Sequence, residues 1–114
     1  MPAPIPKRLL PDDVLVRPLD TASRRGGGFL EPVAMRHARL DRNVAAGAHS
    51  APYQLQEATV ALLFVDAVNT GGAFEVAPGS KVSGDGGESW YTVEAVHAFS
   101  AFGGVHHWEL ELRR

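Results

Sequence analysis

The chain has 114 residues, a formal net charge of −2 at pH 7 and no cysteine. A chain of this length forms one domain that buries roughly two thirds of the surface its unfolded state exposes, and the lack of cysteine excludes disulfides, thiolate metal sites and a cysteine nucleophile. The basic residues form no long run, which argues against a surface dedicated to nucleic acid. No window is apolar for long enough to span a membrane and the N-terminus lacks the apolar core of a signal peptide, so we expect a soluble protein with no membrane partner.

The N-terminus predicts an extended arm over residues 1–10. Proline at positions 2, 4 and 6 removes backbone donors and restricts φ to the polyproline range, so we expect neither helix nor strand at its start. Two interpretations stay open, a frayed terminus and a segment that docks on a neighbouring subunit through Ile5.

Two strand patterns occupy the first half of the chain. Val14–Leu19 is a short apolar run with a proline near its end, and the loop Asp20–Gly28 follows it. Between Met35 and Ala38 the apolar phase slips by one residue, which predicts a β-bulge near His37. A short helix over residues 33–42 is the competing interpretation.

The next segment is a loop of twelve residues, without periodicity and without lysine or arginine. Loops of this length inside a compact domain are often functional or disordered. Its residues are Asn43, Val44, Ala45, Ala46, Gly47, Ala48, His49, Ser50, Ala51, Pro52, Tyr53 and Gln54.

The strongest strand pattern runs from Gln56 to Asp66. In its second half both faces are apolar, with Leu62 and Phe64 on one side and Leu63 and Val65 on the other. The outer side of a small barrel is normally exposed to solvent. Because Leu63 and Val65 are apolar, we expect them to be covered by another part of the chain or by a second subunit. Both options remain open.

Three further segments complete the strand set. A short strand is predicted at Ser80–Ser83, and the glycine-rich residues Gly84–Gly87 after it are typical of a turn. Together they predict a hairpin whose second strand is Trp90–His97. The pattern there puts Tyr91, Val93 and Ala95 on one face. Phe99–Gly104 is predicted to be a connection into the last strand.

The chain ends in a predicted strand that closes the fold. Alternation from Val105 to Leu112 puts His106, Trp108, Leu110 and Leu112 on the core face and His107, Glu109, Glu111 and Arg113 on the other. The sum is an all-β fold, a small antiparallel β-barrel or sandwich of about six strands with a long inter-strand loop and an extended N-terminal arm.

No constellation in the sequence argues for an enzyme, a metal or a cofactor. His106 and His107 are neighbours on a strand and point to opposite faces in regular geometry, so the two are not expected to share a metal with His97. Glu109 and Glu111 share a face, but on an outer strand such a pair is ordinarily solvated. We therefore expect no catalytic residues.

Several segments together resemble a family of small phage minor capsid proteins. They are IPKRLLPDDV, ALLFVDAVNT, PGSKV with YTVEAV after it, and the ending HAFSAFGGVHHWELEL. Members of this family are similar to the head-closure or stopper proteins of the head–tail connector in long-tailed phages. The resemblance covers the chain from Ile5 to Leu112.

The resemblance implies a structural part of the virion neck, assembled in the host cytoplasm. Such proteins are small β-barrels that form a cyclic ring on the portal axis, below the portal or adaptor protein and above a tail-completion or tail protein. They retain the packaged double-stranded DNA that passes through the lumen. By position, Asn43–Gln54 corresponds to the gating loop in that lumen, and Ile5, Leu63 and Val65 are the expected subunit interface.

Other functions stay open. One is a tail-completion protein or another ring at the same junction, and a more distant one is a free-standing β-barrel that binds oligonucleotide or sugar. The second of these needs aromatic and basic residues on one open sheet face, whereas Trp90 and Tyr91 alternate between faces.

Overall fold

The structure is a computed structural model that describes residues 3–22, 28–42, 55–101 and 103–114. In these ranges the only helical element is the 3₁₀ turn η1, and no helix is long and apolar enough to cross a membrane. The elements are η1 (Lys7–Leu9), β1 (Asp12–Arg17), β2 (Val33–Arg42), β3 (Ala61–Asp66), β4 (Lys81–Ser83), β5 (Tyr91–Ala101) and β6 (Gly104–Arg113). The predicted extended arm over residues 1–10 is therefore wrong at its end, which turns through η1.

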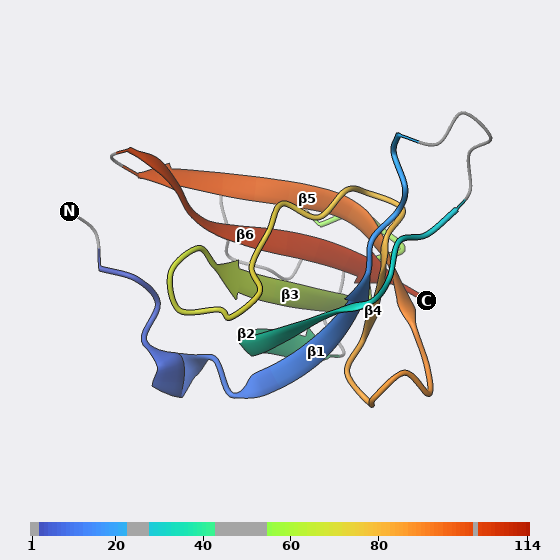
Figure 1. The fold of residues 1–114 in the computed structure, drawn as a ribbon, viewed down its shortest axis with the longest axis horizontal. Coiled ribbons are helices and arrows are strands. Elements are labelled where there is room, and N and C mark those ends of the chain that lie inside the picture. Colours follow the sequence, from blue (N-terminus) through green and yellow to red (C-terminus); the bar gives the residue numbers. More distant parts are fainter. Residues whose placement is uncertain (1–2, 23–27, 43–54, 102) are drawn as a thin grey trace.

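The six strands form a closed antiparallel barrel in the order β1-β2-β3-β6-β5-β4 (Figure 1). Pairing of β1 with β4, with Leu15 opposite Ser83, closes it. Because β3 lies beside β6 and not beside β4, the last four strands have a Greek-key arrangement. The all-β prediction is confirmed, and the barrel rather than the sandwich is the architecture.

A β-bulge in β2 confirms the phase slip in the sequence. Asp12 pairs with Ala38 and Val14 pairs with Met35, so β2 has one residue more than β1 over this stretch. His37 lies in this stretch with φ of 58°, and Met35 and Ala38 both face the core. The competing helix over this segment is wrong.

A second bulge lies in β5 and shifts its inward face. Val93 pairs with Leu112 but Ala95 pairs with Glu111, so Val93 and then Val96 pack against the core. The prediction that Ala95 shares a face with Tyr91 and Val93 is wrong, because it assumed an alternation without a bulge. The predicted connection from residue 99 is also shorter, since β5 continues to Ala101.

The barrel interior contains Leu63 and Val65, two of the three residues that were expected at a subunit interface. Leu63 and Val65 are 0% exposed in the single chain and belong to the core with Trp108, Leu110 and Leu112. Their predicted place at a subunit interface is therefore wrong, because the barrel itself buries them. The predicted strand from residue 56 is also too long at its start, since β3 begins at residue 61.

Candidate functional site

The outer face of β6 is buried although its residues are charged. Glu109 and Glu111 point away from the core, yet both are buried, with Glu111 only 1% exposed. The segment that precedes β3 contacts this face, since Gln56 and Thr59 both bond to Glu111. The expectation that Glu109 and Glu111 are solvated is therefore wrong.

Glu111 joins three parts of the chain. One carboxylate oxygen accepts the Gln56 N–H at 2.7 Å and the Thr59 hydroxyl at 2.9 Å, and the other lies 2.6 Å from His97 Nε2. Burial alone would raise the pKa of Glu111, but the hydrogen bonds from His97, Gln56 and Thr59 and the His97 charge outweigh it, so its pKa lies below the ordinary value of 4.5. Glu111 is thus ionised at neutral pH and fastens the segment before β3 to the barrel.

His106 and His107 contact each other, contrary to the sequence prediction. Phe99 pairs with His107, but the next residue, Ser100, pairs with Val105, so β6 has one extra residue at His106. This β-bulge brings two consecutive side chains together. Their Nδ1 atoms are 2.8 Å apart. His107 also stacks on Phe99 and is partly buried.

Each ring of this histidine pair has a second partner through its Nε2 atom. His106 Nε2 lies 2.7 Å from the Ala3 carbonyl and His107 Nε2 lies 2.9 Å from a Glu109 carboxylate oxygen. Both oxygens only accept, so both Nε2 atoms donate.

Asp66 holds the N-terminal arm against the same end of the barrel. Its carboxylate accepts N–H groups from Ile5 at 2.9 Å, Val68 at 3.0 Å and Asn69 at 2.7 Å. The Asn69 side chain in turn donates to the Ile5 carbonyl at 2.8 Å. The Ile5 backbone is therefore fastened to its own barrel, which neither of the two sequence-based interpretations predicted.

The pKa of Asp66 is lowered, as is that of Glu111. Burial alone would raise it, but the N–H groups of Asn69, Ile5 and Val68 and the nearby His106 hold the pKa below the ordinary value of 3.8. Both carboxylates therefore keep their charge in the folded chain.

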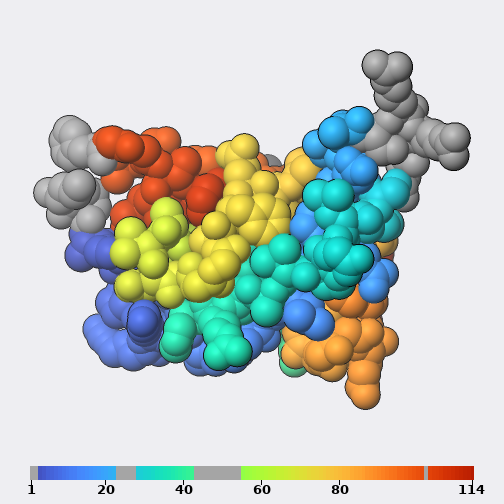
Figure 2. All heavy atoms as spheres, in the orientation of Figure 1, coloured from blue at the N-terminus to red at the C-terminus, as the bar shows by residue number. Residues whose placement is uncertain are grey.

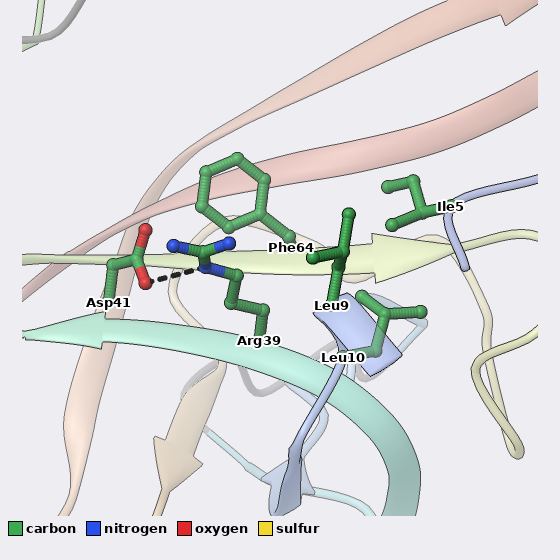
Figure 3. A pocket seen from close by; sticks show the side chains of 6 residues that line it. All are labelled: Ile5, Leu9, Leu10, Arg39, Asp41 and Phe64. Carbon is green, nitrogen blue, oxygen red and sulfur yellow. Dashed lines mark hydrogen bonds and ion pairs between the residues drawn. The ribbon is translucent and has the colours of Figure 1, made fainter. Parts of the chain in front are cut away.

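The docked arm forms one wall of a pocket of about 270 Å³ (Figure 3). The other wall comes from β2 and β3, and Arg39 Nε pairs with Asp41 at 2.9 Å beside it. We call this the arm pocket. Its lining residues are Ile5, Leu9, Leu10, Arg39, Asp41 and Phe64.

Of the sequence-predicted site, the candidate gating loop Asn43–Gln54 lies outside the described residues. Among the residues that are described, no group of three or more histidine, aspartate or glutamate side chains is arranged to hold a metal ion. The buried roles of Asp66 and Glu111 were missed, because an acidic residue at the end of a strand usually faces water.

Comparison with known proteins adds no relative. No family model, no curated protein and no solved structure that was searched matches this chain. The class that the fold defines is a small closed antiparallel β-barrel with a docked N-terminal arm.

The lowered pKa values of Asp66 and Glu111 predict acid sensitivity. In the unfolded chain both groups bind protons at higher pH than in the folded chain, so their contribution to stability is complete above about pH 5 and is lost as the pH falls through the folded values. Urea midpoints measured from pH 7 to pH 3 should decline below about pH 5. Glu111→Gln should flatten this decline, and an unchanged slope in that variant would contradict the assignment to Glu111.

Proposed function

We propose that this chain is a structural subunit of the head–tail connector of a long-tailed phage. Its copies form a cyclic head-closure ring between the portal or adaptor assembly and the tail. The ring retains packaged double-stranded DNA in the virion and offers a docking surface to the tail-completion or tail protein.

The observation that carries this proposal is a closed six-stranded barrel whose longest connection between strands joins β2 to β3. Stoppers are expected to be barrels of this kind with a lumen loop between two early strands, and that connection contains residues 43–54. The segments of the sequence that resemble phage minor capsid proteins motivate the same role. Residues 43–54 contain no lysine or arginine, which suits a lumen loop that must not bind the DNA phosphates.

Cryo-electron microscopy of the intact virion neck tests the proposal. We expect a ring of this chain between portal and tail, with residues 43–54 directed into the lumen. Density for the chain on the capsid shell, or its absence from the neck, would overturn the connector role. A neck ring in which residues 43–54 face outward would overturn the gating role.

A further inference from the structure

Basic side chains from neighbouring strands form one row across the outside of the barrel. The strand register places Arg17 of β1 opposite Lys81 of β4. Lys81 is in turn opposite Thr92 of β5, and Thr92 is opposite Arg113 of β6. Directly opposite residues of antiparallel strands lie on the same face, with Cβ atoms about 4.5–5.5 Å apart. We call these four residues the basic row. Because its cations are far apart in the chain, no basic run in the sequence indicates them.

The basic row faces away from the core. Each of its members is next in sequence to a core residue, and consecutive residues of a strand point to opposite faces. These core residues are Val16, Val82, Val93 and Leu112. The Lys81 ammonium donates to the Thr92 hydroxyl at 2.6 Å, as expected for side chains on one face. Arg113 is exposed, and Arg17 and Lys81 are partly exposed, so the charges of the row are accessible from solvent.

The positive charges of the basic row are not neutralised by the described part of the chain. Within these residues, none of the three cations forms an ion pair with a carboxylate. Glu111, two residues before Arg113 on the same strand, is buried and lies 2.6 Å from His97 instead. Like charges that lie directly opposite each other, such as Arg17 and Lys81, destabilise a sheet. An anionic partner on this face offsets that cost.

An aromatic ring flanks the basic row at β1. The guanidinium carbon of Arg17 lies 4.6 Å from the ring centroid of Trp90, a cation–π contact in which the guanidinium keeps its charge. Trp90 is partly exposed and precedes β5 in the hairpin that joins β4 to β5. Figure 2 shows this hairpin, in orange, projecting from the surface next to atoms of β1, in blue. The face thus combines cations, which bind phosphates, with an aromatic ring, on which bases stack.

We propose that the basic row and Trp90 bind single-stranded nucleic acid. Arg17, Lys81 and Arg113 contact its phosphates, and one base stacks on the Arg17–Trp90 pair. The row crosses three strand spacings, about 14 Å, so the strand runs across the sheet from β1 to β6. With three phosphate contacts and no base-specific bonds, the dissociation constant is expected at roughly 10⁻⁴–10⁻⁶ M. Such binding needs only one subunit and is independent of the connector role.

Fluorescence anisotropy with a labelled oligothymidylate of about 15 nucleotides tests the phosphate contacts. The affinity should fall about twentyfold between 50 and 200 mM salt, because three phosphate contacts release counterions from a single strand. Arg113→Gln changes an exposed side chain and should reduce the slope of log affinity against log salt by about 0.7. The control is Arg8→Gln, which removes the same charge from exposed η1 and should bind like the unmodified chain. Circular dichroism checks that both variants fold.

Tryptophan fluorescence tests the stacked base. The oligonucleotide should quench the emission of the unmodified chain, and Trp90→Ala should lose this quenching, because the remaining Trp108 lies in the core and is only 9% exposed. Trp90→Ala should also weaken binding at least about fivefold.

Three results overturn the proposal. They are no measurable binding at 50 mM salt, an Arg8→Gln variant that loses as much affinity as Arg113→Gln, and tighter binding of a duplex of the same length than of the single strand. None of them bears on a ring in the virion neck, which electron microscopy tests separately.

Discussion

Replacing Glu111 by alanine is expected to lower the free energy of unfolding by about 3 kcal/mol, because it removes a buried carboxylate and leaves the groups that bond to it without their acceptor. Thr59 loses its side-chain acceptor, the Gln56 N–H loses its carboxylate oxygen, and His97 loses a contact of 2.6 Å. The loss extends beyond β6, since these bonds fasten the segment before β3. Urea denaturation followed by tryptophan fluorescence measures it.

Two further variants separate the causes of that loss. Glu111→Gln keeps an oxygen that accepts from Gln56 and Thr59 but removes the charge beside His97, and we expect a smaller loss of about 2 kcal/mol. Glu57→Ala removes an exposed carboxylate in the same region and should cost less than about 0.5 kcal/mol. Equal losses in Glu111→Ala and Glu57→Ala would show that the buried contacts do not stabilise the chain.

Replacing Asp66 by alanine is expected to cost about 3 kcal/mol and to release the N-terminal arm. The fully buried carboxylate accepts N–H groups from Ile5, Val68 and Asn69, and alanine leaves all of them without this acceptor. The arm contains Lys7 and Arg8, both exposed, so its release should speed tryptic cleavage after these residues. Mass spectrometry of the N-terminal peptides over time measures the rate.

The matched control for Asp66 is Asn69→Ala. It removes the side-chain bond to the Ile5 carbonyl and leaves the N–H groups on Asp66 paired, so we expect a loss of about 1 kcal/mol and a smaller gain in cleavage. If trypsin cleaves the Asp66→Ala variant no faster than the Asn69→Ala variant, the Asp66 carboxylate is not what holds the arm.

Some features of the fold followed from local pattern. The alternation of Trp108, Leu110 and Leu112 predicted an inward face, because only a strand collects such residues on one side. The slip between Met35 and Ala38 predicted the bulge at His37, since an extra residue restores the inward phase.

Other features depended on pairing between distant strands. In β3 the residues on both faces of the strand are apolar, so the two-residue alternation does not indicate which face points into the barrel. Pairing of Leu63 with Leu40 on one side and Leu110 on the other decided it, and the single chain buries Leu63 completely. Likewise the bulge at His106 arises from pairing with β5, and no pattern within the sequence of β6 predicted it.

The sequence by itself determined an all-β chain of about six strands, because strand period and turn residues act within a few residues. Only the tertiary structure decided that the sheet closes into a barrel, that Leu63 lies inside it, and that Glu111 is buried and charged. The reason is physical: the burial of a side chain depends on what covers it. For Glu111 the cover comes from Gln56 and Thr59, which lie more than fifty residues away.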